Sequence, residues 1–184
     1  SQVIHAGIYY PSTSLKSRLC ARGNRLIYEY CKKYNVPFNN CGKWIVARYI
    51  YASLLIINSN EEQTKYLESL KLSTDDFLHP ASRLSLTPTA KAQILEPRIK
   101  AHSILSSPST GIISLHDLGT SLASQINGHV VTNCKVVDVK RDLVWKVSTS
   151  DGGELDADIV INAAGFGAPK IASMMTGEVY EDMI

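Results

Sequence analysis

The sequence has few cysteines and no strong excess of charge, and both features exclude common classes of site. Its four cysteines, Cys20, Cys31, Cys41 and Cys134, form no Cys-x-x-Cys pair and have no histidine partner at zinc spacing. Neither a metal site nor thiol redox chemistry is therefore expected. The 19 Lys and Arg residues nearly balance the 17 Asp and Glu residues, without the basic stripe that binding to nucleic-acid phosphates requires. Nucleic acid is not expected as a partner.

The chain also lacks a hydrophobic run that could cross a bilayer, which takes about 20 helical residues. Its most apolar stretch, Arg48 to Ser59, is too short and too interrupted for that role, and we interpret it as an unusual insert that extends a strand or adds an edge. The first residues show no signal or transit peptide. Because the sequence does not begin with Met and opens on a strand-like triplet, we expect a fragment that is truncated at both termini.

The 184 residues are 45% hydrophobic and 20% charged, which is typical of a globular chain that buries a core. A long amphipathic helix is predicted after Ser12-Thr13-Ser14, ending at Asn35. Its apolar positions recur at steps of three and four residues, and they are Leu15, Leu19, Leu26, Ile27, Tyr30, Cys31 and Tyr34. Lys16, Arg18, Arg22 and Arg25 fall at helical spacing and are interpreted as its solvated face. Gly23 costs this helix about 1 kcal/mol relative to alanine, which suggests close packing at that point.

Further elements follow from local periodicity and from turn residues. A strand is predicted over 42–47, and a second helix over 61–72 has Tyr66, Leu67 and Leu70 facing inward. Short strands are predicted at 93–95 and 111–113, and a helix at 116–126. Three more strands are predicted at 130–132, 135–140 and 144–149, followed by a turn at Asp151-Gly152-Gly153.

Residues 159–168 are the most informative stretch. An apolar run, Ile159-Val160-Ile161, leads into the small residues Ala163, Ala164 and Gly165, which predicts a buried strand that ends where a ligand can approach the backbone. Pro169 can open a helix at its first position and leave amides free to face an anion. The pattern is typical of a dinucleotide site, although many α/β strands also end in small residues.

The block His5-Ala6-Gly7-Ile8-Tyr9-Tyr10, with the helix start at 14–20 behind it, closely resembles the L-2-hydroxyglutarate dehydrogenase family. The resemblance continues through 28–31, 41–47, 95–97, 107–112 and 161–165 and covers nearly the whole chain. The first block is specific to that subfamily. The Asn-Ala-Ala-Gly block at 162–165 marks only the wider superfamily of FAD-dependent oxidoreductases, which is similar to glycerol-3-phosphate dehydrogenase and D-amino-acid oxidase.

The resemblance implies a mixed α/β (α+β) fold, in which a Rossmann-like FAD-binding domain is interleaved with a β-sheet substrate domain. We expect residues 1–41 and 114–184 to belong to the FAD-binding domain. Residues 42–113 then form a partial substrate domain that carries the insert at about 48–59. The glycine-rich turn with which this family holds the pyrophosphate does not occur in the sequence.

The resemblance also implies a reaction, the oxidation of L-2-hydroxyglutarate to 2-oxoglutarate with hydride transfer to flavin N5. It places Ser1, Gln2 and Val3 along the flavin, and Val136 near the adenine. Ala163, Ala164 and Gly165 are placed near the pyrophosphate. His5 lies beside the isoalloxazine and is the candidate base, because histidine can be neutral at physiological pH and accept a proton. The alternatives are a structural role for His5, and His116 as the base.

Two other functions stay open. One is a flavoprotein oxidase or dehydrogenase that acts on another 2-hydroxy acid, an amine or glycerol 3-phosphate. The other is a non-catalytic remnant that no longer binds FAD and serves as an interaction module.

The resemblance also implies a location. It is mitochondrial if the source is eukaryotic, and otherwise cytoplasmic or peripheral to the inner membrane. The sequence does not identify the electron acceptor.

Overall fold

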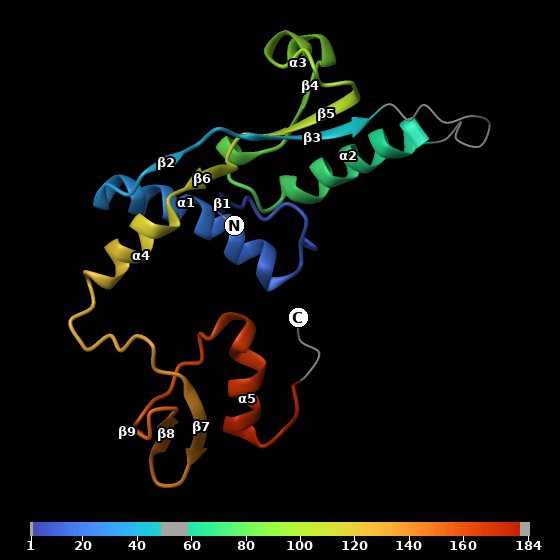
Figure 1. Ribbon diagram of the computed structural model, residues 1–184. Helices are drawn as coiled ribbons and strands as arrows, with labels where there is room; N and C mark the ends of the chain where they lie inside the picture. Colours follow the sequence, from blue (N-terminus) through green and yellow to red (C-terminus); the bar gives the residue numbers. More distant parts are fainter. Residues whose placement is uncertain (1, 49–58, 181–184) are drawn as a thin grey trace. The chain divides into compact units, whose positions relative to one another are not determined.

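The computed structural model describes residues 2–48 and 59–180 (Figure 1). The chain forms two compact units, Ser1–Gln125 and Ile126–Ile184, called unit 1 and unit 2 below. Helices and antiparallel sheets occur in both, which confirms a mixed α/β fold. The predicted apolar insert at 48–59 lies, except for its first and last residues, outside the described residues.

The long helix of unit 1, α1 (Leu15–Tyr34), begins and ends where the sequence predicts. The Ser14 hydroxyl accepts a hydrogen bond from the Ser17 amide at 3.2 Å, which caps the first turn. Asn35 adopts the left-handed conformation at φ 56° and closes the last turn with a hydrogen bond to the Cys31 carbonyl. Cys31 is buried as predicted.

The buried face of α1 differs in part from the predicted one. Leu15, Leu19 and Leu26 are exposed by 66%, 55% and 42%, whereas Ser17 and Asn24 are buried. The reason is that α1 packs through residues about half a turn away from the leucines, where polar side chains find backbone partners. The predicted cationic positions are solvent-exposed, which confirms their assignment to the outer face.

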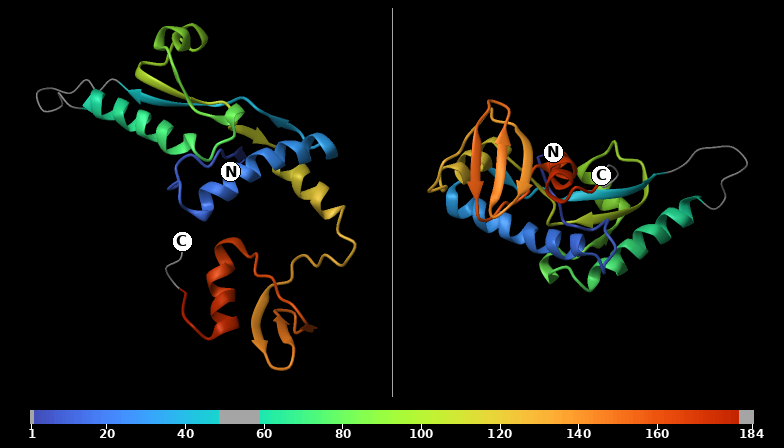
Figure 2. Two further views of the ribbon diagram at one scale, coloured as in Figure 1. Left: turned by 180° about the vertical axis from the view of Figure 1, so that it is seen from behind. Right: turned by 90° about the horizontal axis from the view of Figure 1, so that it is seen from below.

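Unit 1 also contains two antiparallel three-stranded sheets (Figure 2). The first has the order β1-β6-β2, with β1 at Val3–Ile4, β6 at Gly111–Ile113 and β2 at Phe38–Asn39. The second has the order β3-β5-β4, with β3 at Lys43–Arg48, β5 at Ala101–Ser107 and β4 at Ser85–Thr87. The predicted strands at 42–47 and 111–113 are confirmed. Helix α4 (Leu115–Ala123) confirms the helix predicted at 116–126.

Helix α2 (Ser59–Asp75) runs along the β3-β5-β4 sheet (Figure 1). Its Leu67 and Leu70 are buried in a cluster with Leu105 of β5, as predicted. Tyr66 is 55% exposed, so its predicted inward position is wrong. It lies one residue before Leu67, and the rotation of about 100° per residue carries it off the packed face.

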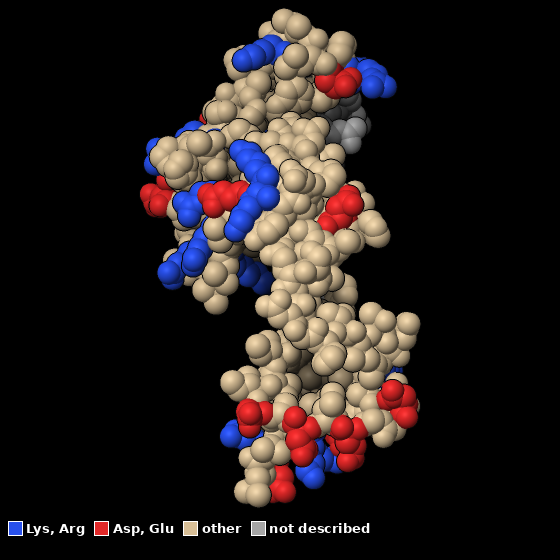
Figure 3. Space-filling view, turned by 90° about the vertical axis from the view of Figure 1, so that its left-hand side faces the viewer, with Lys and Arg blue, Asp and Glu red and all other residues tan. Residues whose placement is uncertain are grey.

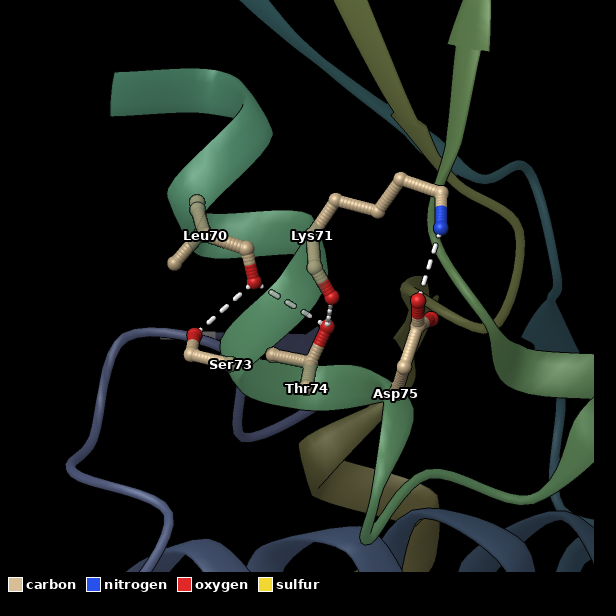
Figure 4. Close-up of polar contacts among 5 residues, drawn as sticks. All are labelled: Leu70, Lys71, Ser73, Thr74 and Asp75. Carbon is tan, nitrogen blue, oxygen red and sulfur yellow. Dashed lines mark hydrogen bonds and ion pairs between the residues drawn. The ribbon is translucent and has the colours of Figure 1, made fainter. Parts of the chain in front are cut away.

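The end of α2 carries a compact polar network (Figure 4). The buried Thr74 hydroxyl bonds the carbonyls of Leu70 at 3.1 Å and Lys71 at 2.9 Å, and Ser73 also donates to the Leu70 carbonyl. Lys71 pairs with Asp75 at 2.7 Å. These contacts close the helix and fix the direction in which the chain enters the turn that follows it.

The predictions of short strands at 93–95 and at 130–132 are wrong. Residues 93–95 belong to helix α3 (Thr89–Leu95), whose Ala92 is fully buried while Ile94 is 81% exposed. Pro88 directly precedes the helix, and proline is favoured at the start of helices. The segment buries only the small Ala92 and has no alternating apolar face that a strand could pack. Residues 130–132 are not in a strand, and Val130 and Val131 are exposed by 56% and 69%.

Unit 2 is a three-stranded meander with one helix (Figure 2). Strands β7 (Val136–Arg141), β8 (Trp145–Thr149) and β9 (Glu154–Ala157) pair antiparallel in that order. Helix α5 (Ala168–Thr176) packs against β7, with proline in its first turn as predicted. The predicted strands at 135–140 and 144–149, and the turn at 151–153, are confirmed.

The buried strand predicted at 159–161 is a correction. These residues form no strand, and Ile159 and Ile161 are exposed by 78% and 85%. A strand needs neighbours that pair with its backbone groups, and within the described residues no other strand lies alongside this segment.

Candidate functional site

His5 directly follows the edge strand β1 of unit 1. Its side chain is exposed, while its neighbours Ile4 and Ala6 are buried at 5% and 4% exposure. Because side chains alternate along extended backbone, His5 and Val3 share the open face, and Val3 is 38% exposed. Gln2 is also exposed, whereas Ser1 lies outside the described residues.

The backbone of His5 is held by Asn24 of α1. The Asn24 side-chain amide donates to the His5 carbonyl at 3.1 Å and to the Ser109 carbonyl at 2.8 Å. Tyr28, one turn further along α1, donates to the same Ser109 carbonyl at 3.0 Å. Asn24 is only 6% exposed. It therefore joins three segments that are far apart in the sequence, and its buried amide has both hydrogen atoms bonded.

Local sequence pattern did not single out Asn24. The sequence does contain one signal for a buried polar residue: Asn24 lies on the same side of the long helix as Ala21 and Tyr28. Buried amides are nearly always hydrogen-bonded, so such a residue indicates a fixed partner. The partners themselves lie 19 and 85 residues away in the sequence, and local pattern cannot supply them.

Gly111 lies where the backbone of β6 meets α1. A Cβ atom there would lie 2.2 Å from the Tyr28 hydroxyl and 2.6 Å from the Asn39 carbonyl oxygen. Only glycine fits this approach, which accounts for glycine in the Ser-Thr-Gly-Ile block of the resemblance.

Burial raises the pKa of the Tyr28 hydroxyl, with smaller contributions from the Cys41 and Cys31 thiols. Tyr28 is therefore a neutral hydrogen-bond donor at physiological pH. Burial likewise raises the pKa of the Cys31 thiol, which makes it less reactive. Tyr28 bonds the Ser109 carbonyl, and Cys31 packs in a buried cluster with Ile4, so both groups contribute to the structure of unit 1.

In unit 2, Ala163, Ala164 and Gly165 form an exposed turn that leads toward α5. Gly165 has a φ of 56°, and a Cβ atom there would meet nothing within 4 Å. The Asn162 side chain fixes the turn: its amide donates to the Ala168 carbonyl at 2.8 Å, and its oxygen accepts from the Ala164 amide at 3.3 Å. Small side chains thus leave this backbone open to a ligand.

Helix α5 starts directly after this turn and has no side-chain cap. The Ala168 amide bonds the Gly165 carbonyl and Pro169 has no amide hydrogen, so the positive end of the helix dipole is the feature of this start that favours an anion. The small residues before it leave room for such a group. Val136, the residue expected near adenine, is half-buried in β7.

The expected site residues are divided between the two units. Gln2, Val3 and His5 belong to unit 1, and Val136 and 163–165 belong to unit 2. His116, the alternative base, is exposed in the first turn of α4 in unit 1. Over residues 2–48 and 59–180, no three His, Cys, Asp or Glu side chains group as metal ligands, and no helix is long and apolar enough to cross a membrane.

Comparison with known proteins gives a consistent result. The chain is 30% identical to the mitochondrial L-2-hydroxyglutarate dehydrogenase of Arabidopsis thaliana, over 96% of this chain and 41% of that protein. The human mitochondrial enzyme is 27% identical over 95% of this chain and 38% of its own length. The enzyme of Escherichia coli K12 is also 27% identical, over 95% of this chain and 39% of its own length. The chain thus spans about two fifths of the length of these curated relatives.

Solved structures with the same fold include two oxidases. L-alpha-glycerophosphate oxidase from Mycoplasma pneumoniae, solved with FAD bound, matches with a TM-score of 0.78 at 22% identity, over 95% of this chain and 45% of that one. Glycine oxidase from Geobacillus kaustophilus matches with a TM-score of 0.75 at 16% identity, over 95% and 46% of the two chains. The family model described as FAD dependent oxidoreductase matches residues 1–183. The chain belongs to this family of FAD dependent oxidoreductases.

Proposed function

We propose that the protein that contains this chain oxidises L-2-hydroxyglutarate to 2-oxoglutarate. The observation that carries the proposal is the 30% identity to the Arabidopsis thaliana dehydrogenase over 96% of the chain, together with an exposed His5 at the end of β1. The names of the eukaryotic relatives also support a mitochondrial location if the source is eukaryotic.

In this proposal the residues named in the resemblance contact FAD. Gln2 and Val3, with Ser1, line the flavin, and Ala163 to Gly165 with the N-terminal end of α5 hold the pyrophosphate. Val136 borders the adenine. Residues 1–41 and 114–184 then serve the cofactor, and 42–113 serve the substrate. When bound, FAD supplies an acceptor for the hydride from C2 of the hydroxy acid.

His5 has the role of base. A neutral imidazole can accept the hydroxyl proton of the substrate within hydrogen-bond reach, and the His5 side chain is exposed for such contact. The hydrogen bond from Asn24 to the His5 carbonyl keeps the backbone of that residue in place without occupying the imidazole.

The first test is cofactor retention. We would incubate the purified 184-residue chain with FAD, desalt it and record its spectrum, expecting flavin bands near about 370 and 450 nm. Ala164→Glu places a carboxylate at the proposed pyrophosphate contact and should abolish retention. The matched control, Ser150→Glu, adds the same charge at an exposed turn of the same unit and should keep it. A colourless wild-type chain would contradict FAD binding by these residues.

The second test concerns the substrate. With a dye as electron acceptor, the FAD-loaded protein should oxidise L-2-hydroxyglutarate much faster than the D enantiomer, glycine or glycerol 3-phosphate. His5→Gln should lower kcat by about 10²- to 10⁴-fold, the usual contribution of a general base, and should leave FAD retention unchanged. His116→Gln serves as the control for the alternative base. Preference for another substrate would refute the proposed reaction but not the cofactor.

A further inference from the structure

Unit 1 contains a cleft of about 830 Å³ whose lining includes neither His5 nor the individually named FAD contacts. One wall is α1, with the exposed Arg18, Arg22, Arg25 and Lys32, and with Asn24 and Tyr28, which bond the Ser109 carbonyl. The opposite wall is the turn that follows α2, from Phe77 to Ser82, and Pro108 and Ser109 also border the cleft. We call it the α1 cleft. Its volume lies in the range typical of small-molecule sites, about 300–1,000 Å³.

The charge of the α1 cleft is strongly positive. Glu29 is its one carboxylate among the described lining residues, and it pairs with Arg25 at 3.6 Å. Arg18, Arg22 and Lys32 make no ion pair within the described part of the chain. Lys and Arg side chains also gather on one face of this unit in Figure 3. Unit 1 as a whole has 14 Lys and Arg against 8 Asp and Glu, a net charge of +6.

This arrangement is unfavourable without a counter-charge. Arg18, Arg22 and Arg25 follow one another at spacings of four and three residues, where side chains on a helix are neighbours and like charges repel. Guanidinium groups present forked donors that match carboxylate and phosphate oxygens. An anion with several carboxylate or phosphate groups would offset the repulsion between the arginines and accept hydrogen bonds from their guanidinium groups.

The opposite wall is suited to hold a ligand in place. The Lys71–Asp75 pair and the Thr74 hydroxyl close α2, and the amides of Phe77 and Leu78 bond the Thr74 carbonyl at 3.3 Å and 3.0 Å. In the same turn, His79 Nδ1 accepts a hydrogen bond from the Ala81 amide. The wall is thus a turn that is held by its own hydrogen bonds.

We propose that the α1 cleft binds a small polyanion with two or more carboxylate or phosphate groups, through residues other than those named as FAD contacts. Two facing walls and a limited volume favour a small molecule over a flat macromolecular surface. The proposal does not depend on the oxidation, because neither His5 nor any individually named FAD contact (Gln2, Val3, Val136 and 163–165) lines this cleft.

The test is isothermal titration calorimetry of the 184-residue chain with citrate and with inorganic pyrophosphate, and with acetate as the monovalent control. One site per chain is expected for both polyanions, with weaker binding at high salt. Arg18→Gln and Arg22→Gln should each weaken binding about tenfold, as expected for the loss of one charged hydrogen bond. These side chains are exposed, and circular dichroism would verify that both variants fold.

Two control variants distinguish binding in the α1 cleft from a diffuse positive field and from binding at the cofactor contacts. Lys33→Gln removes one charge from the same helix outside the cleft and should change the affinity less than twofold. Ala164→Glu, which blocks the proposed FAD contact, should not change it. An equal loss with Lys33→Gln would indicate a diffuse field, and a loss with Ala164→Glu would place the anion at the cofactor site. Either of these two losses would overturn the proposal. The absence of binding would also overturn it, as would tighter binding of hexaglutamate than of citrate, which would indicate a surface for an acidic peptide.

Discussion

The side-chain amide of Asn24 donates a hydrogen bond to the backbone carbonyl of His5 at 3.1 Å, and to that of Ser109 at 2.8 Å. One buried side chain thus ties the end of β1 and the loop before β6 to the middle of α1. The candidate base is held through its backbone, and its imidazole is left exposed.

Replacement of Asn24 should be costly. Asn24→Ala leaves two carbonyls without this donor and should lower the free energy of unfolding by about 1–3 kcal/mol. Asn24→Asp should lower it further at neutral pH, because a carboxylate would face two carbonyl oxygens, and less at acid pH, where the protonated carboxyl can donate once. Urea denaturation at two pH values would measure both effects. A change below about 0.5 kcal/mol for Asn24→Ala, the range of ordinary surface substitutions, would contradict this role.

Gly23→Ala should stabilise the protein. The sequence suggests close packing at Gly23, but a Cβ atom at this position would meet nothing within 4 Å. With no close neighbour, alanine should add about 1 kcal/mol to the stability of α1 through its higher helix propensity. Thermal unfolding followed by circular dichroism would show a higher Tm, and a lower Tm would contradict the open space around Gly23.

Gly111→Ala is the opposite case. The added methyl group would overlap the Tyr28 hydroxyl and the Asn39 carbonyl, so we expect destabilisation of about 1–3 kcal/mol from overpacking. The free energy of unfolding, measured by urea denaturation, would test this. The double variant Gly111→Ala/Tyr28→Phe should regain only part of the loss, because the backbone clash with Asn39 stays. Full rescue would mean that Tyr28 alone requires glycine here.

The stability of unit 2 should depend on Asp151 at acid pH. A hydrogen bond from the Thr149 hydroxyl at 2.6 Å, and further bonds from the Gly153 amide and the Asp151 backbone, lower the pKa of the Asp151 carboxyl. A carboxyl whose pKa is lower in the folded state stabilises the fold above its unfolded pKa, which is about 3.9. That contribution is lost as the pH falls through the lower, folded pKa.

NMR titration of the Asp151 carboxyl would measure this effect. Thr149→Val removes the main hydrogen bond and should raise the pKa of Asp151 toward its ordinary value. Ser150→Ala changes a hydroxyl in the same turn that does not contact the carboxylate, and should not change the pKa. If both variants behave alike, the Thr149 hydroxyl is not the cause.

Local sequence predicted several elements because their signals are local. The periodicity of 15–34, with a serine before it and Asn35 after it, is enough to define α1. The Asp-Gly-Gly sequence predicts the turn at 151–153, but strand β9, which follows that turn, was not predicted. The family resemblance was likewise contained in contiguous blocks such as His5 to Tyr10, and the match over residues 1–183 confirms it.

Tertiary structure decided which faces and partners these elements have. Leu15 and Leu19 have the pattern of core residues yet are exposed, while Ser17 and Asn24 are buried, because the buried face of a helix is set by what packs against it. The apolar run at 159–161 is not a strand, because strand formation needs a paired neighbour. The family resemblance in the sequence indicated His5 as a candidate base. Only the fold showed that Asn24 bonds its backbone carbonyl, because no local sequence pattern encodes a contact between residues this far apart.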